Sequence, residues 1–142
     1  MKRLIDSLDD FSWENYKTIS DAVVKFDEAN VENEMFSQAS MYSYYHGLMS
    51  LAKKITNDLE ADNVRLASKL RSSYKNTHSK LTAKDLDDLV FADEEYNAAL
   101  RVLNEASFKY ELLKGLVRAL EQKKDMLQQV SANKREETKL YK

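Results

Sequence analysis

The longest regular pattern in the 142-residue chain lies between Leu89 and Leu127, which read LVFADEEYNAALRVLNEASFKYELLKGLVRALEQKKDML. Apolar side chains recur there at every seventh position in two rows, the a and d positions of a coiled-coil seam. One row is Leu89, Tyr96, Leu103, Tyr110 and Val117, and the other is Ala92, Ala99, Ala106, Leu113, Leu120 and Leu127. Further apolar residues beside these rows widen the face that must be buried. The pattern predicts one long helix over residues 82–130 that packs against other helices.

A second, less regular heptad pattern precedes it and covers most of residues 33–74. Its two rows are Tyr42, Met49, Thr56, Asn63 and Leu70, and Tyr45, Ala52, Leu59, Leu66 and Ser73. Polar residues at a positions, here Thr56 and Asn63, are typical of seams that fix the register of packing at some cost in stability. This pattern predicts a second long helix.

The stretch 75–81, KNTHSKL, is the only plausible turn between these two helices. Directly after it, Thr82 and Asp85 have the spacing of a capping box, in which each side chain bonds the other residue's backbone N–H at the start of a helix. We therefore expect an all-α fold built on a long antiparallel helical hairpin over residues 34–130, with a basic turn at 64–84.

The two ends of the chain carry weaker signals. Residues 1–33 form an acidic N-terminal segment, in which one face of a short helix is predicted to carry Trp13, Tyr16, Ile19, Val23 and Phe26. Asp10 or Ser12 is expected to cap this helix, which should end near Asn30. The polar and charged residues 131–142 are expected to fray.

The composition agrees with a helical fold and excludes several classes of protein. Pro and Cys are absent and the only glycines are Gly47 and Gly115, whereas β and doubly wound domains need many such residues for their turns. Without Cys, disulfides and thiolate metal sites are excluded. Acids interrupt the amino terminus before any apolar run, so no signal peptide is predicted. No apolar run approaches the roughly 18 residues of a membrane span, and a cytoplasmic location is expected.

A lone hairpin shares one seam and leaves its flanking apolar rows exposed. We therefore expect a homo-oligomer that covers them. The residues expected at its interface are Tyr96, Leu103, Tyr110, Leu113, Val117, Leu120 and Leu127. The alternative is a monomeric three-helix bundle, in which residues 1–33 cover the exposed stripe.

The net charge of −2 is distributed unevenly. Residues 64–84 hold no acid and six bases, which are Arg65, Lys69, Arg71, Lys75, Lys80 and Lys84. Tyr74 and His78 lie among them, and rings among cations are typical of proteins that bind single strands without sequence preference. The alternative is a solvated basic turn that balances acidic segments elsewhere. A second basic set, diluted by acids, is interpreted as solvated surface and comprises Lys123, Lys124, Lys134 and Arg135.

No catalytic constellation can be assembled from the sequence. The only histidines are His46 and His78, and neither has a Glu three residues before it, as the di-iron helical bundles require. There is no glycine-rich phosphate loop and no nucleophile motif. The tyrosines 42, 44 and 45 are interpreted as packing residues. We expect a protein that is not an enzyme and that carries no cofactor or metal.

Two stretches resemble the UvsY recombination mediators of T-even-like phages, which are small and nearly all-helical. Within residues 34–74 the likeness lies in Met41-Tyr42-Ser43, Lys53-Lys54, Glu60-Ala61 and the basic stretch that ends in Tyr74. Within residues 89–130 it lies in Ala92-Asp93, Leu103, Gly115 and Ala119-Leu120. The spacing of these residues is similar and ungapped, and together the two stretches cover a little over half of the chain.

The resemblance implies a ring-like homo-oligomer, with hexamers or heptamers as precedent, that assembles through its C-terminal helices. It implies binding of single-stranded DNA through the sugar-phosphate backbone. The further partners it implies are a phage RecA-like recombinase, UvsX, and the phage single-strand-binding protein that covers the strand before UvsX is loaded. These activities belong to recombination, repair and recombination-dependent replication in the host cytoplasm.

The DNA-contacting element of the family is a Lys-Ala-Arg-type stretch shortly before the tyrosine. The matching positions here read Ser68-Lys69-Leu70-Arg71, with the basic residues displaced by one. We expect Lys69, Arg71 and Lys75 to neutralise phosphates, with contributions from Arg65, Lys80 and Lys84 and stacking by Tyr74. The alternative is a non-enzymatic helical adaptor or scaffold, such as a virion or regulatory protein, that binds only protein. A membrane-surface helix is disfavoured because the basic stretch lacks a bulky apolar face.

Overall fold

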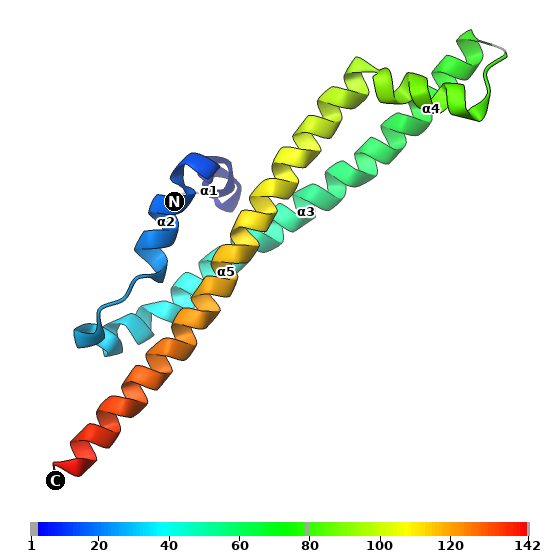
Figure 1. Ribbon diagram of the computed structural model, residues 1–142. Coiled ribbons are helices and arrows are strands. Elements are labelled where there is room, and N and C mark those ends of the chain that lie inside the picture. Colours follow the sequence, from blue (N-terminus) through cyan, green and yellow to red (C-terminus); the bar gives the residue numbers. More distant parts are fainter. Residues whose placement is uncertain (1–2, 79, 142) are drawn as a thin grey trace. The chain divides into compact units, whose positions relative to one another are not determined.

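A computed structural model describes residues 3–78 and 80–141, and every regular element in this part of the chain is helical (Figure 1). The elements are α1 (Leu4–Asp10), α2 (Trp13–Val24), the 3₁₀ turn η1 (Glu28–Asn30), α3 (Val31–Thr77), α4 (Ala83–Ala92) and α5 (Glu94–Leu140). The all-α prediction is confirmed. Within the described residues, no helix combines the length and the apolar character needed to cross a membrane.

The chain divides into two compact units. Unit 1 contains the residues up to Leu51 and those from Lys109 onward, and unit 2 contains Ala52–Phe108. The long helices α3 and α5 each continue from one unit into the other.

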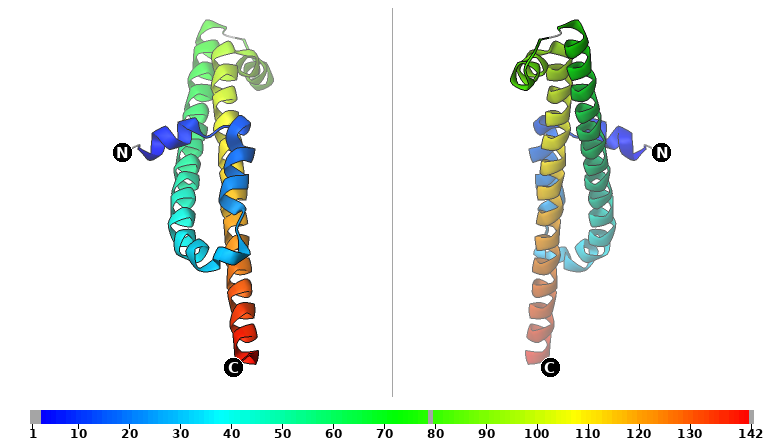
Figure 2. Two further views of the ribbon diagram at one scale, coloured as in Figure 1. Left: turned by 90° about the vertical axis from the view of Figure 1, so that its left-hand side faces the viewer. Right: turned by 90° about the vertical axis from the view of Figure 1, so that its right-hand side faces the viewer.

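The core of unit 1 is formed by α1, α2, the first part of α3 and the later part of α5. Its buried apolar side chains are Leu8, Phe11, Val23, Val31, Leu48, Leu113, Leu116, Val117, Leu120 and Leu127. Figure 2 shows α2 lying along α5, and the hydroxyl of Tyr16 lies close to Gly115. The described residues 3–33 therefore cover the apolar stripe of α5 in unit 1 within the single chain, as the monomeric alternative expects for this unit.

Two lysines of α5 hold the N-terminal helices in place. Lys109 Nζ donates to the carbonyl of Leu8 at 2.9 Å, near the end of α1. Lys123, only 2% exposed, donates to the carbonyl of Val23 at 2.9 Å and pairs with the Glu34 carboxylate at 3.1 Å. Neither α1 nor α2 has a basic residue in its last turn, so α5 supplies the cations that favour a helix C-terminus. The interpretation of Lys123 as solvated surface was wrong.

The boundaries of the N-terminal helices differ from the prediction. The heptad and capping signals did not indicate α1, and α2 ends at Val24 because Lys25 is extended, several residues before the predicted Asn30. Ser12 is the N-cap of α2, and its backbone N–H donates to Asn15 Oδ1 at 2.9 Å. Of the two caps considered, Ser12 is therefore the one used.

The expected fraying after residue 130 is not seen, because α5 remains helical to Leu140. Two contacts support this end of the helix. Lys134 Nζ donates to the carbonyl of Glu28, and Lys139 pairs with Glu136 one turn away at 3.6 Å. Lys142 lies outside the described residues.

The predicted turn and the predicted cap both lie in unit 2. Helix α3 ends at Thr77, and Ser79 of the predicted turn lies outside the described residues. The capping box is confirmed: Thr82 Oγ1 accepts from the Asp85 N–H, and Asp85 Oδ2 accepts from the Thr82 N–H, both at 3.2 Å.

The long helix predicted over 82–130 is two helices, because Asp93 interrupts it. Asp93 is extended, with φ −67° and ψ 132°. Its Oδ1 accepts the N–H of Tyr96 at 3.1 Å, which caps the start of α5. Asn97 Nδ2 donates to the carbonyls of Phe91 and Asp93, both at 2.9 Å. The chain therefore turns sharply between α4 and α5, and the turn leaves α4 as a separate short helix.

The core of unit 2 is small and partly polar. Its buried side chains are Ala52, Thr56, Asn63, Leu86 and Val90. Thr56 Oγ1 donates to the carbonyl of Ala52 at 2.8 Å, whereas Asn63 Nδ2 is buried without a hydrogen-bond partner among the described residues. Both polar residues predicted at a positions of the α3 heptads are thus buried.

Candidate nucleic-acid interface

All seven residues predicted to bind DNA belong to unit 2. Five of them are on the last part of α3, Lys80 is in the connection to α4, and Lys84 is in the first turn of α4. Helix α4 lies near the end of α3 (Figure 1), and Arg71 of α3 donates to Asp87 of α4. The structure therefore brings the predicted residues to the same end of unit 2.

The structure also brings acidic residues to this end of unit 2. Counting charges within residues 64–84 did not predict this. Residues 85–95 contain no base and six acids, Asp85, Asp87, Asp88, Asp93, Glu94 and Glu95. These six follow directly on the six bases of residues 64–84. Because α4 folds back beside α3, the run that is free of acid in the sequence is not free of acid in space.

Three of the seven predicted residues are bonded to acids. Arg71 Nη1 donates to Asp87 Oδ1. The hydroxyl of Tyr74 donates to Asp93 Oδ2 at 2.6 Å. Arg65 pairs with Asp62 on the same helix at 2.9 Å, and both of those side chains are well exposed. An exposed pair contributes about 0 to 1 kcal/mol, so a stronger anion can replace it.

The bond between Tyr74 and Asp93 shifts the pKa of both groups. It raises the pKa of the Tyr74 phenol, with burial and the charge of Asp93 as smaller causes. It lowers the pKa of the Asp93 carboxyl, helped by the backbone N–H groups of Tyr96 and Glu95 and opposed by burial. At neutral pH, Tyr74 is therefore a protonated donor and Asp93 a charged acceptor.

The four lysines of the predicted set are free to meet a ligand. Lys69, Lys75, Lys80 and Lys84 are exposed. None of the four forms an ion pair or a hydrogen bond through its side chain with another described residue. The lysine ammonium is a compact charge on a flexible stem, which suits phosphates whose positions vary along a strand. His78 is also exposed, and its N–H continues the last turn of α3 by donating to the carbonyl of Tyr74 at 2.9 Å.

The predicted packing role of the tyrosine cluster fits what surrounds these residues in unit 1. The hydroxyl of Tyr42 donates to Glu121 on α5 at 3.1 Å, which raises the pKa of the Tyr42 phenol. The rings of Tyr44 and Tyr45 pack edge to face, with their centroids 5.0 Å apart, and burial raises the pKa of Tyr45.

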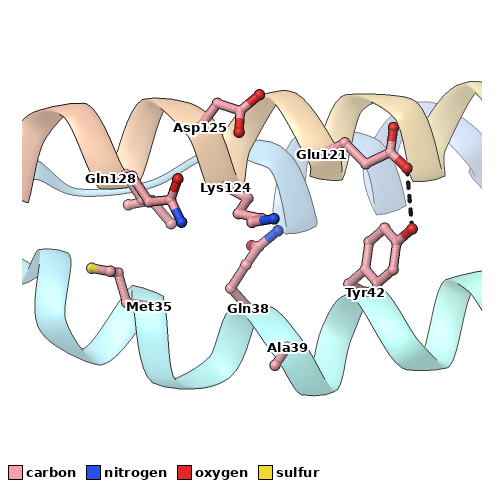
Figure 3. Close-up of a pocket in the computed structure, with 9 residues that line it drawn as sticks. Met35, Gln38, Ala39, Tyr42, Glu121, Lys124, Asp125 and Gln128 are labelled. Atoms are coloured by element: carbon pink, nitrogen blue, oxygen red, sulfur yellow. Dashed lines mark hydrogen bonds between the residues drawn. The ribbon is translucent and has the colours of Figure 1, made fainter.

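A groove of about 630 Å³ lies between α3 and α5 of unit 1 (Figure 3). It is lined by Met35, Gln38, Ala39 and Tyr42 of α3 and by Glu121, Lys124, Asp125, Leu127 and Gln128 of α5. Gln38 Nε2 donates to the carbonyl of Leu120 at 2.7 Å, while its buried Oε1 has no partner among the described residues. The sequence did not indicate this groove.

The residues predicted to form an oligomer interface fall into two groups. Leu113, Val117, Leu120 and Leu127 are at most 4% exposed within the single chain, so in this conformation they are core residues and offer no surface to a second copy. Tyr96, Leu103 and Tyr110 are half-buried. The exposed apolar residues of α5 include Val102 and Met126.

Among the described residues, no cluster of His, Cys, Asp and Glu has the arrangement to hold a metal ion. No protein-family model, curated protein or solved structure matches the chain.

Proposed function

We propose that this protein is a non-enzymatic recombination mediator. It binds single-stranded DNA without sequence preference and helps to load a RecA-like recombinase onto strands covered by single-strand-binding protein. The observation that carries the proposal is the set of four exposed lysines, Lys69, Lys75, Lys80 and Lys84, at one end of unit 2. The resemblance to the UvsY family supports the same function.

In this proposal the lysines neutralise phosphates and leave the bases unread. Each phosphate neutralised contributes about −0.7 to the slope of log affinity against log salt for a single strand. Four lysines would therefore give a steep salt dependence and equal affinity for unrelated sequences. Arg71 and Tyr74 contribute less to the affinity for the strand, because in the free protein they are bonded to Asp87 and Asp93.

Self-association is part of the proposal. A ring-like homo-oligomer would place several lysine sets on one strand, and linked sites bind more tightly than one site alone. The surface proposed for this contact is the part of α5 that the chain leaves uncovered, with Val102 exposed and Leu103 half-buried.

The test is a salt titration of binding to a fluorescent oligonucleotide, followed by anisotropy. The variant Lys69→Ala/Lys75→Ala should bind more weakly to every sequence and should flatten the salt slope by about 1.4, which is two lysines at about 0.7 each. The matched control is Lys114→Ala/Lys124→Ala, which removes the same charge from exposed lysines of unit 1. An equal loss in both variants would move the binding site away from unit 2.

The alternative, an adaptor that binds only protein, is favoured by a different observation. Phe36 is 85% exposed on α3, next in sequence to Met35 of the groove in Figure 3. An adaptor would show no affinity for oligonucleotides even at low salt. That result would contradict the proposed mediator function and favour the adaptor function.

A further inference from the structure

We propose that α4 is an autoinhibitory flap, which competes with a nucleic-acid strand for the basic end of α3. The inference rests on the proposed function, because it concerns the regulation of the same site. Two contacts carry it: Arg71 donates to Asp87, and Tyr74 donates to Asp93. In the first contact a carboxylate oxygen occupies a guanidinium donor that a phosphate would otherwise use, and in the second the bond holds the half-buried ring of Tyr74 at the C-terminal end of α4.

The arginine and the tyrosine ring are the two groups that add most to a lysine site. A guanidinium binds phosphate oxygens through two parallel hydrogen bonds, which a lysine cannot do. A tyrosine ring stacks on any base. With Arg71 held by Asp87 of α4 and Tyr74 held by Asp93 at the C-cap of α4, the free protein presents the lysines and the exposed Arg65. The strand gains Arg71 and the ring of Tyr74 after α4 moves.

The construction of α4 suits such a movement. It is a ten-residue helix with extended residues at both ends, Thr82 and Asp93. Helices of this length are marginal on their own, and only Leu86 and Val90 of α4 are buried. Phe91, by contrast, is 63% exposed. An element with few buried contacts opens at low free energy.

The closing contacts are also weak enough to exchange. The side chains of Arg71 and Asp87 are 41% and 49% exposed, and exposed ion pairs contribute little net stability. A strand already held by the lysines presents many phosphates near Arg71. Replacement of one carboxylate by a phosphate therefore needs no large change in free energy.

The first test compares oligonucleotide binding by full-length Asp87→Asn and Asp88→Asn. Both variants remove one negative charge from α4, but Asp88 is exposed and forms no ion pair with a described residue. Asp87→Asn should bind up to about fivefold more tightly than Asp88→Asn, the range of an exposed ion pair. It should also steepen the salt slope by about 0.7, because Arg71 gains a phosphate. With Arg71→Ala added, the two variants should bind alike.

The second test follows amide hydrogen exchange in the wild-type protein with and without the oligonucleotide. The amides of α4 should exchange faster when the strand is bound, while those at the end of α3 should become better protected. This measurement reports the movement directly and does not depend on a variant.

The outcomes separate the flap from the proposed function. Binding by the wild type together with equal affinities of Asp87→Asn and Asp88→Asn would overturn the flap alone. Unchanged or slower exchange in α4 on binding would do the same. Absence of binding by every variant at low salt would overturn both.

Discussion

At the scale of the single residue, Asp93 forms hydrogen bonds to two different helices. One carboxylate oxygen caps α5 through the N–H of Tyr96, and the other accepts the hydroxyl of Tyr74 from α3. Asp is a preferred N-cap residue because its short side chain reaches backbone N–H groups. Through its bond to Tyr74, the same side chain also joins the turn between α4 and α5 to α3.

The pKa shifts of this pair define the pH range over which the contact stabilises the fold. The pKa of Asp93 is lowered from 3.8, so its contribution is complete above about 3.8 and is lost as the pH falls through the lower folded value. The pKa of Tyr74 is raised from 10.0, so its contribution is complete below 10.0 and is lost as the pH rises through the higher folded value.

We predict that Asp93→Asn returns the pKa of Tyr74 toward 10.0. The substitution removes the charged acceptor, although Asn remains able to cap α5. An NMR titration of the tyrosine rings measures the change, with the Tyr74 signal assigned from Tyr74→Phe. Tyr42 is the internal control, because its pKa is raised by Glu121 and should not move. The same Tyr74 titration in wild type and variant would show that Asp93 does not cause the shift.

At the scale of the element, the two long helices each contain one glycine in their interior. A Cβ atom at Gly47 of α3 would meet nothing within 4 Å. One at Gly115 of α5 would meet only the hydroxyl of Tyr16, at 3.9 Å, an ordinary contact. Glycine lowers helix stability relative to alanine by about 0.5 to 1 kcal/mol.

We predict that Gly47→Ala and Gly115→Ala each raise the free energy of unfolding by about 0.5 to 1 kcal/mol. Urea denaturation followed by circular dichroism measures both. The helix term is the same in the two variants, so any difference between them reports the neighbourhood of Tyr16. A loss of stability in Gly115→Ala alone would mean that α2 packs on α5 more closely than the structure describes.

The elements also differ in how well the sequence predicted them. The two heptad patterns and the capping box of Thr82 and Asp85 are local signals, and the sequence was enough to recognise all three. The break at Asp93 was missed because both apolar rows continue past it, one from Leu89 to Tyr96 and the other from Ala92 to Ala99. A periodic count does not detect a change of direction. The pairing of Arg71 with Asp87 was missed because it depends on how α4 folds back. No local pattern distinguishes buried Lys123 from exposed Lys124.

At the scale of the molecule, the apolar stripe of α5 has to be divided between the core and self-association. The residues that α2 and α3 cover in unit 1 belong to the core, and those left uncovered are the surface proposed for a second copy. The sequence predicted that the stripe must be covered, but it left open whether a second copy or the N-terminal segment does so. Length and periodicity are the same in both cases.

We predict that Leu120→Ala and Val102→Asp separate these two roles. Leu120 is fully buried, so its truncation should cost about 2 to 5 kcal/mol of unfolding free energy. Val102 is 53% exposed, so Val102→Asp should leave unfolding almost unchanged and should lower the mass measured by light scattering. The same mass in wild type and Val102→Asp would contradict the proposed interface.

The two lysines that hold α1 and α2 require the length of the N-terminal segment to match a fixed distance along α5. Lys109 and Lys123 are fourteen residues apart, which is about 21 Å along a helix and brings the second side chain back to within about 40° of the first. A one-residue deletion between them would rotate one lysine by about 100° around the helix axis relative to the other. A seven-residue deletion would nearly keep the phase but halve the spacing. The helical segments before α3 are thus matched in length to four turns of α5.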